Sequence, residues 1–423
     1  MNIKITNPLH GGTVHAISSK SEAQRLLVCA ALADKETVII CPYVSEDIEA
    51  MANCLEELSA VVSYEHDRFF IKPIPRNVEK KEQYFLDCGE SGTALRFLLP
   101  VCATLGLSVS INMHGRLPQR PLTVLYDEMV AHGCKLSEQG KSPLTCEGQL
   151  ANGTYNIPGN ISSQYISGLL LALPVLKDDS KINVIGNLES RPYVDITLDI
   201  LKKFGINVSE DEQGFFIPGS QIGHSPKSLQ VGGDWSNAAF WLVAGAIGRE
   251  TITCTGLEQN SCQGDRAIIE ILKQFGADVK CEDNSFTTSP SKLYGIDIDA
   301  KDIPDLVPIL AALASVSEGK TTFHNARRLR IKESNRLQTT ATMLSDLGAD
   351  IKEDGDSLVV IGKNWLKGGI TQSFGDHRIA MTAAIISAKC ETPVIIQNAE
   401  AVRKSYINFF EDFAKLGGVY EQN

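Results

Sequence analysis

The chain repeats one arrangement of hydrophobic and polar positions six times. In each copy a helix-like run ends in an apolar residue and a glycine, followed by alternating residues and an acidic turn. The clearest copies read HGCKLSEQG, FGINVSEDEQGFFI, FGADVKCEDNSFTT and LGADIKEDGDSLVVI, and weaker ones read LSAVVSYEHDRFFI and LGGVY. A glycine after a helix is typical of a left-handed cap, and alternating residues before a turn predict a strand. The pattern therefore predicts a recurring order of helix, strand, turn and strand.

The spacing of these copies is nearly constant. The marker residue is glycine in every copy but the first, which has Ser59; it stands at positions 59, 133, 205, 276, 348 and 417, so the gaps are 74, 72, 71, 72 and 69 residues. Because this period exceeds the usual solenoid repeats, each copy is predicted to be a small α/β unit. Six units suggest two domains of three units each. Helices are predicted at 21–33, 92–105, 121–132, 162–175, 192–204, 235–248, 265–275, 304–317, 332–347, 376–389 and 405–416.

Composition narrows the class of protein. A length of 423 residues with 43% hydrophobic content exceeds what one core usually supports and favours two domains. The net charge of −11 argues against a nucleic-acid or membrane partner, so any anion site is expected to be a local pocket. The 11 cysteines occur singly without a C-x-x-C pair, which favours a cytoplasmic location and predicts neither disulfides nor a structural metal. The start of the chain lacks a signal-peptide pattern, and no apolar run reaches the ~18 residues of a membrane helix.

The stretch Asp87–Arg96, DCGESGTALR, is the first candidate for chemistry. Gly89 and Gly92 leave backbone N–H groups uncovered at a predicted strand-to-helix turn, which favours binding of a phosphate or carboxylate. No Lys-Ser/Thr pair follows, so it is not a Walker A loop, and without a third glycine it is not a dinucleotide fingerprint. A plain glycine-rich turn would have the same sequence.

Other polar residues also gather at predicted helix starts. Lys20 is electrostatically unfavourable there, which indicates an anion ligand, and Arg120 before Pro121 offers a planar fork for a carboxylate or phosphate. Lys332 and Arg336 lie four residues apart on one helical face, which favours a shared anionic ligand. Ser162, Ser163 and Gln164 head an apolar helix and could form a neutral phosphate cradle, although a serine there could be only an N-cap.

In order along the chain, these segments resemble the 5-enolpyruvylshikimate-3-phosphate synthases, or 3-phosphoshikimate 1-carboxyvinyltransferases. The similarity rests on SKSEAQR, GESGTALR, QRPL, SSQY, SRPYVDITL, GDWSNAAF, IPD, RIKESNR, GDHRIAM and the lysine of VRKSY, from Lys20 to Lys404. Glu90 departs from the family's common asparagine, Phe97 stands where proline is frequent in some members, and Arg328 occupies a variable position.

The resemblance implies a fold and a reaction. The expected fold is α/β (α+β), with two globular domains that each contain three βαβαββ units: 19–233, and 1–18 with 234–423, with the site in the cleft. The implied reaction transfers the enolpyruvyl group of phosphoenolpyruvate to the 5-hydroxyl of shikimate 3-phosphate and releases phosphate, through a tetrahedral intermediate on the route to chorismate. No cofactor, metal, nucleic acid or membrane is implied. A monomer is expected. Inhibition by glyphosate is also expected: in this family an added methyl group at the counterpart of Gly92 excludes glyphosate, and this chain has the glycine.

The resemblance also implies roles for individual residues. The catalytic residues would be Asp305 as base toward the hydroxyl, Glu333 and Lys404 for proton transfer at the methyl carbon, and Lys20. Shikimate 3-phosphate would be bound by Lys20, Ser21, Arg25, Ser162, Ser163, Gln164, Ser190, Tyr193, Asp305 and Lys332. Phosphoenolpyruvate would be bound by Lys20, Gly92, Arg120, Gln164, Arg336, Arg378 and Lys404. Since a carboxylate beside that ligand would repel it, Glu90 is expected to turn toward Arg96 or Arg120.

Two other functions are compatible with parts of the sequence. The related UDP-N-acetylglucosamine 1-carboxyvinyltransferases share the fold and phosphoenolpyruvate chemistry, but they carry a loop cysteine that HGRLPQRP lacks. An inactive, anion-binding repeat protein is the second alternative. The presence of Lys20, Asp305, Glu333, Arg378 and Lys404 together argues against it, because binding alone does not require an acid-base pair.

Overall fold

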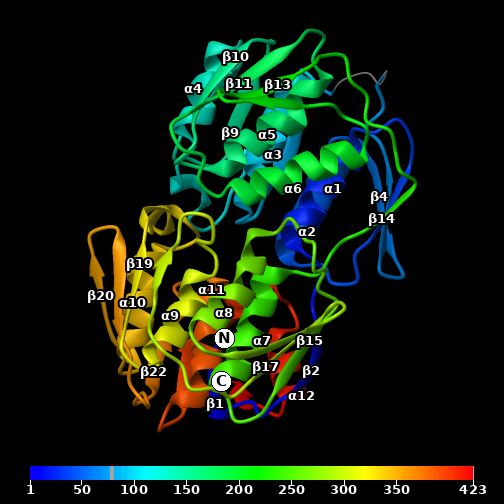
Figure 1. Cartoon of the computed structure of the whole chain (residues 1–423). Coiled ribbons are helices and arrows are strands. Elements are labelled where there is room, and N and C mark those ends of the chain that lie inside the picture. Colours follow the sequence, from blue (N-terminus) through cyan, green and yellow to red (C-terminus); the bar gives the residue numbers. More distant parts are fainter. Residues whose placement is uncertain (77–80, 423) are drawn as a thin grey trace. The chain divides into compact units, whose positions relative to one another are not determined.

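The computed structural model describes residues 1–76 and 81–422, which contain six four-stranded sheets of mixed direction (Figure 1). By its internal packing the chain divides into an N-terminal unit, Ser18–Val231, and a C-terminal unit, Met1–Ile17 with Gly232–Asn423. Each unit has three of the sheets. In the N-terminal unit the strand orders are β14-β3-β5-β4, β6-β7-β9-β8 and β10-β11-β13-β12, and in the C-terminal unit β16-β17-β15-β2, β18-β19-β21-β20 and β22-β23-β1-β24.

The bounds in the N-terminal unit are as follows. Its helices are α1 Lys20–Ala31, α2 Glu46–Glu57, α3 Gly92–Thr104, α4 Thr123–Ala131, α5 Ser163–Ala172 and α6 Arg191–Lys203, with 3-10 turns η1 Leu117–Gln119 and η2 Leu173–Val175. Its strands are β3 Thr37–Ile40, β4 Val61–Glu65, β5 Arg68–Lys72, β6 Tyr84–Asp87, β7 Val109–Asn112, β8 Lys135–Leu136, β9 Leu144–Glu147, β10 Thr154–Pro158, β11 Ser180–Ile185, β12 Ser209–Asp211, β13 Gly214–Ile217 and β14 Ser228–Gln230.

The C-terminal unit is built in the same way. Its helices are α7 Trp235–Ile247, α8 Ile268–Gln274, α9 Val307–Ser315, α10 Arg336–Asp346, α11 His377–Ile386 and α12 Phe409–Lys415, with 3-10 turns η3 Gly264–Ala267, η4 Arg327–Ile331, η5 Ser387–Lys389 and η6 Ala399–Lys404. Its strands are β1 Ile3–Asn7, β2 Gly12–His15, β15 Ile252–Thr255, β16 Asp278–Glu282, β17 Ser285–Ser289, β18 Asp297–Asp299, β19 Lys320–His324, β20 Asp350–Asp354, β21 Ser357–Ile361, β22 Gly369–Gln372, β23 Val394–Gln397 and β24 Val419–Gln422.

The repeat is the predicted βαβαββ unit. In the copy from β6 to β9, β6 pairs with β7 in parallel, and β9 pairs antiparallel with both β7 and β8. The copies from β10 to β13 and from β18 to β21 have the same pairing. The last copy is completed by the N-terminal strand β1, which lies between β23 and β24. The expected fold class is therefore confirmed.

The marker residues have the backbone conformation that the pattern predicts. Ser59 at the end of α2 has a φ of 76°, and the five marker glycines are also left-handed, with φ between 72° and 100°. The helix α2 itself was not among the predicted helices, although the weak copy of the pattern around Ser59 follows it directly. Its four glutamates are exposed while Ile48, Met51 and Leu55 are buried.

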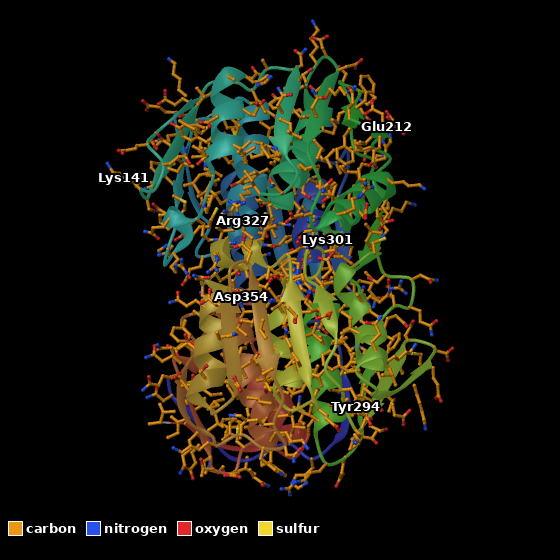
Figure 2. The ribbon with its side chains drawn as sticks, turned by 60° about the vertical axis from the view of Figure 1, so that its left-hand side comes forward. Lys141, Glu212, Tyr294, Lys301, Arg327 and Asp354 are labelled. Atoms are coloured by element: carbon orange, nitrogen blue, oxygen red, sulfur yellow. The ribbon has the colours of Figure 1, made fainter. Side chains whose placement is uncertain are left out.

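One helix from each repeat forms the core of its unit. Nearly every residue of α3 and α5 is buried, and so is nearly every residue of α7, α9 and α11, as expected for helices that are apolar on all sides. The helices α3 and α5 pack so closely that a Cβ atom at Gly168 would lie 2.2 Å from the carbonyl oxygen of Arg96. Charged side chains such as Lys141 and Glu212 lie on the outside (Figure 2). Within the described ranges, no helix combines the length and hydropathy needed to span a bilayer.

Candidate functional site

In the N-terminal unit, two arginines lie against the glycine that begins α3. A Cβ atom at Gly92 would be 2.4 Å from Nη1 of Arg96 and 2.8 Å from Nη1 of Arg120. Arg96 donates to Oε1 of Gln164 at 3.1 Å and to the carbonyl of Pro121 at 2.9 Å. These bonds join the first turns of α3 and α5 to the segment before α4. The arrangement brings Gly92, Arg120 and Gln164 together around a buried cation, Arg96, which was not among the predicted ligands.

Lys20, at the first position of α1, is held by a carboxylate. Its Nζ atom lies 2.8 Å from Oδ2 of Asp47, in the first turn of α2, and both side chains are mostly buried. Asp47 was not predicted, because the helix that carries it was missed. This partner accounts for a cation at a helix start: the carboxylate offsets the unfavourable helix dipole and orients the amine.

Arg25 is a buried strut in the same unit. Its side chain donates to Oγ1 of Thr197 at 2.7 Å, the carbonyl of Ser21 at 2.6 Å, the carbonyl of Tyr193 at 3.0 Å and Oγ of Ser167 at 3.4 Å. Burial lowers the pKa of Arg25 to about 10, well above neutrality, so the side chain stays charged. Most of its donors therefore fix α1 to α5 and α6, which places Ser21 and Tyr193 beside one another.

The predicted phosphate-binding serines lie at two helix starts. Ser162 is the N-cap of α5 and accepts from the backbone N–H of Gln164 at 3.3 Å, so its capping role is real. Ser163 follows it and is 5% exposed. Ser190 precedes α6 with a left-handed φ of 53°, and its side chain is buried. Such a conformation is uncommon for a residue with a Cβ atom, and strain of this kind gathers at functional sites.

In the C-terminal unit, three cations converge on one carboxylate. Asp305 lies 2.8 Å from Nη1 of Arg336, 2.9 Å from Nη2 of Arg378 and 3.4 Å from Nζ of Lys332. Burial alone would raise the pKa of Asp305, but the three positive charges outweigh it and hold the pKa well below its ordinary value. The anion that Lys332 and Arg336 share in this structure is thus the protein's own Asp305.

Two further carboxylates fix Arg336, which is 1% exposed. Asp376, the N-cap of α11, accepts from Nε at 2.8 Å and Nη2 at 3.2 Å. Glu333 lies 2.6 Å from Nη2. Lys404, at the end of η6, donates to the carbonyl of Gly375 at 2.7 Å, just before α11. The predicted proton-transfer residues Glu333 and Lys404 therefore reach this cluster from different repeats.

Glu90 lies against the chain after β7. A Cβ atom at Gly115 would lie 2.4 Å from both Cδ and Oε2 of Glu90, so the carboxylate lies directly against this glycine. Gly115 also has a φ of 53°, which glycine adopts readily. The expectation that Glu90 orients Arg96 or Arg120 stays a prediction.

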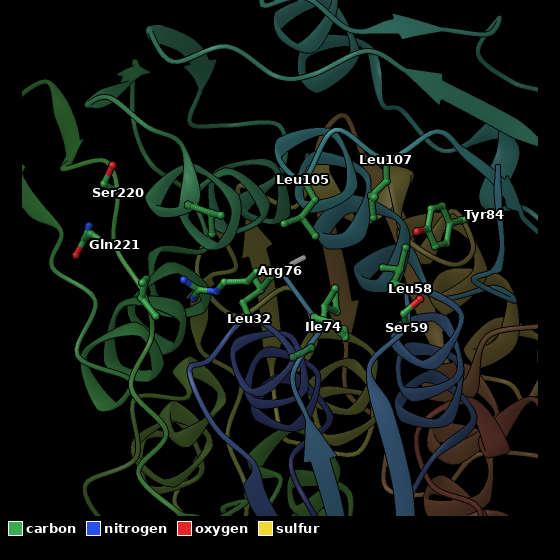
Figure 3. A pocket seen from close by; sticks show the side chains of 14 residues that line it. Leu32, Leu58, Ser59, Ile74, Arg76, Tyr84, Leu105, Leu107, Ser220 and Gln221 are labelled. Atoms are coloured by element: carbon green, nitrogen blue, oxygen red, sulfur yellow. The ribbon is translucent and has the colours of Figure 1, made fainter. Parts of the chain in front are cut away.

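A separate cavity of about 380 Å³ lies at the opposite ends of the helices in the N-terminal unit (Figure 3). It is lined by the residues that end α1, α2 and α3, namely Leu32, Leu58 and Leu105, together with Arg76 and Tyr84. It includes none of the predicted site residues. Across the part of the chain that the structure describes, no group of three or more His, Cys, Asp or Glu residues could hold a metal ion.

Comparisons with known proteins agree on one family. The family model described as EPSP synthase (3-phosphoshikimate 1-carboxyvinyltransferase) matches residues 3–413. A 3-phosphoshikimate 1-carboxyvinyltransferase of Clostridium kluyveri is 45% identical over 413 residues, which cover 97% of this chain and 96% of the relative. The corresponding protein of Clostridium novyi is 43% identical over 430 residues, covering 100% and 98%.

Two solved structures share the fold. EPSP synthase from Acinetobacter baumannii has a TM-score of 0.83 at 24% identity, with all of both chains covered. The enolpyruvyl transferase NikO from Streptomyces tendae has a TM-score of 0.78 at 17% identity, covering 100% of this chain and 98% of that one.

Proposed function

This chain belongs to the EPSP synthase (3-phosphoshikimate 1-carboxyvinyltransferase) family, and we propose how its residues divide the work of that reaction. It is a transferase of the shikimate pathway, which serves aromatic amino-acid biosynthesis. It transfers the enolpyruvyl group of phosphoenolpyruvate to the 5-hydroxyl of shikimate 3-phosphate and releases phosphate. The roles of the residues below are our assignments.

Shikimate 3-phosphate is bound mainly by the N-terminal unit in this proposal. Ser162, Ser163 and Ser190 supply hydroxyl groups at two helix starts, where backbone N–H groups and the helix dipole favour a phosphate. The charged Arg25 and the adjacent Ser21 would bind its carboxylate. Tyr193, Gln164 and Lys332 would contact the ring.

Phosphoenolpyruvate is bound by cations of both units. Arg120 beside Gly92, together with Lys20, would come from the N-terminal unit, and Arg336, Arg378 and Lys404 from the C-terminal unit. Two highly charged anions repel one another by several kcal/mol at about 4 Å when poorly screened, so an excess of cations is needed to bring them into contact. The proposed domain bounds, 19–233 and 1–18 with 234–423, assign the two sets to different domains.

Asp305 is the proposed base. In the structure its three cation partners hold its pKa well below the ordinary value. When the substrate anions take over Lys332, Arg336 and Arg378, the charge that lowers the pKa is shared, and the carboxylate becomes more basic. The hydroxyl oxygen then adds to C2 as Asp305 accepts its proton and Glu333 or Lys404 donates one to C3. Loss of phosphate and of a proton from C3 restores the double bond.

The observation that carries this proposal is the convergence of Lys332, Arg336 and Arg378 on Asp305. The test measures phosphate release from phosphoenolpyruvate with shikimate 3-phosphate, and with UDP-N-acetylglucosamine as a control acceptor. Only the first acceptor should support turnover. Asp305→Asn should lower kcat at least about a hundredfold while binding of shikimate 3-phosphate is kept. The exposed Asp297→Asn is the matched control. Unchanged kcat in Asp305→Asn would overturn the assignment.

Finer properties are also proposed. Glyphosate should compete with phosphoenolpyruvate, since Gly92 carries no methyl group and the guanidinium groups of Arg96 and Arg120 lie directly against it. The protein is expected to act as a monomer in the cytoplasm, and its 11 free cysteines are compatible with a reducing compartment. Inhibition kinetics and the mass in solution test the first two points.

A further inference from the structure

Gln24 is a buried side chain of α1 that has no part in the proposed binding of either substrate. It is 0% exposed. Its Nε2 group donates to the carbonyl of Asp47 at 2.9 Å and to Oγ of Ser91 at 3.0 Å. Asp47 belongs to the first turn of α2, and Ser91 is the N-cap of α3. One amide group therefore ties the starts of two helices to α1.

The orientation of this amide follows from its partners. A carbonyl oxygen only accepts hydrogen bonds, so the amide must present an N–H group to Asp47. Oγ of Ser91 also accepts from the backbone N–H of Ala94 at 3.3 Å, as an N-cap does. Both amide hydrogens are then used, whereas Oε1 of Gln24 finds no hydrogen-bond donor within the described parts of the chain. A buried oxygen without a donor costs stability, which favours a role for the two N–H groups that stability alone does not explain.

Both partners of Gln24 stand next to groups assigned to phosphoenolpyruvate. The carboxylate of Asp47 lies 2.8 Å from Nζ of Lys20. Ser91 immediately precedes Gly92, the first residue of α3. The amide thus links the helix start that holds Lys20 to the helix start that begins with Gly92. A displacement of the amide would move these two groups relative to one another.

The neighbouring Arg25 reaches different elements. It donates to Thr197 and to the carbonyl of Tyr193 on α6, and to Ser167 on α5. Successive residues of a helix lie ~100° apart around its axis, so adjacent side chains of α1 point to different neighbours. Gln24 and Arg25 therefore fix different helix starts, and a change at Gln24 should affect one substrate more than the other.

We propose that Gln24 is a positioning residue for phosphoenolpyruvate. Its two N–H groups hold the starts of α2 and α3 at the separation that the ligand needs between Lys20 and Gly92. Gln24 itself does not touch the substrates in this proposal. The inference rests on the proposed function, because it requires Lys20 and Gly92 to contact phosphoenolpyruvate.

Gln24→Met tests the role of the two N–H groups. Methionine is unbranched and similar in length, and it also removes the buried Oε1 atom, so the variant should fold. KM for phosphoenolpyruvate should rise about tenfold, because small displacements of substrate-positioning groups are costly. Kd of shikimate 3-phosphate in calorimetry should change less than about threefold. Gln24→Glu has the same size but, when ionised at pH 8, no donor, and should raise KM for phosphoenolpyruvate at least as much as Gln24→Met.

Gln221→Met is the matched control. It removes an amide of the same unit that donates to the carbonyls of Asn207 and Pro218, at 2.9 Å and 2.8 Å. The change therefore breaks the same kind of hydrogen bond away from the proposed site. KM for phosphoenolpyruvate and Kd of shikimate 3-phosphate should both stay unchanged.

A double-variant cycle tests whether Gln24 acts through the start of α3. Ser91→Ala removes the acceptor and should also raise KM for phosphoenolpyruvate. Because the two changes break one shared hydrogen bond, the rise in the double variant should be at least about threefold smaller than the product of the two single rises. A rise equal to that product would contradict the proposed link.

Three other results in active proteins would overturn the inference. These are an unchanged KM for phosphoenolpyruvate in Gln24→Met or Gln24→Glu, equal losses for both substrates, or the same rise in Gln221→Met. If the wild type does not turn over these substrates at all, the proposed function fails instead.

Discussion

Adding a methyl group at Gly92 tests the phosphoenolpyruvate side of the site most directly. The Cβ atom of Gly92→Ala would lie 2.4 Å from Nη1 of Arg96, and 2.8 Å and 3.1 Å from Nη1 and Cζ of Arg120. Contacts this short are strongly repulsive, so both guanidinium groups must shift. The backbone of Gly92, the first residue of α3, is not in the left-handed region, so alanine itself causes no backbone strain there.

Of the two groups, Arg120 is expected to move further. Arg96 is 3% exposed and is held by Gln164 and the carbonyl of Pro121, so its displacement would break hydrogen bonds in the core. A charge-assisted hydrogen bond contributes roughly 1.5–3 kcal/mol. Misplacing the proposed ligand Arg120 should therefore raise KM for phosphoenolpyruvate by about ten- to a hundredfold. KM for shikimate 3-phosphate should change less than about threefold, because the proposed ligands of its phosphate and carboxylate lie at α1 and at the starts of α5 and α6.

The assay is steady-state kinetics with each substrate varied in turn, together with the glyphosate concentration that halves the rate. Gly89→Ala is the matched control, since it adds the same methyl group three residues earlier, where no atom lies within 4 Å. That change should lower stability by about 1 kcal/mol because of its left-handed φ of 54°, while KM stays unchanged. The reasoning is refuted if Gly92→Ala leaves KM for phosphoenolpyruvate unchanged, or if Gly89→Ala raises it equally.

Three further predictions concern single side chains. Arg25→Ala should weaken binding of shikimate 3-phosphate in calorimetry and lower the free energy of unfolding by about 3–5 kcal/mol, because it strips partners from buried oxygens; unchanged affinity in the folded variant would remove Arg25 from the site. Lys404→Ala should lower kcat at least about a hundredfold and change the Kd of shikimate 3-phosphate less than about threefold; equal losses in both would contradict its proposed role. Glu90→Asn should be tolerated, whereas Glu90→Ala should raise KM for phosphoenolpyruvate; tighter binding in Glu90→Ala would show that the carboxylate faces the ligand.

The fold could be predicted from the sequence because its signal is local and repeated. A left-handed residue after a helix, followed by alternating hydrophobic and polar residues, gives a similar sequence pattern in every copy. Six copies at a nearly constant spacing strengthen the prediction of a repeated unit. The helix α2 was left out of the predicted helices even though the weak copy of the pattern follows it; in that copy Ser59, with a φ of 76°, has the left-handed conformation of the marker glycines. That the N-terminal strand β1 completes a sheet could not be predicted from any local pattern, because its partner strands β23 and β24 lie at the other end of the chain.

The candidate site was predictable only in part. Residue types at helix starts pointed to Lys20, Arg120 and Arg336 as binders of anions. Their partners in the structure were not predictable in the same way, because each pairing joins two separate elements. Lys20 pairs with Asp47 of α2, and Arg336 with Asp376, 40 residues further on. Ion-pair partners depend on distances in the folded chain, which helix-start patterns do not contain.

The carboxylate partners neutralise the clustered cations of the site. Three cations around Asp305 would repel one another by several kcal/mol without carboxylates at about 3 Å. Asp305, Glu333 and Asp376 therefore hold Lys332, Arg336 and Arg378 in place. We propose that substrate binding exchanges these anions for those of the substrates and releases Asp305 from its cations. In the proposed mechanism, a base with a depressed pKa thus becomes competent only when the substrates are bound, which links proton transfer from the hydroxyl group to a filled site.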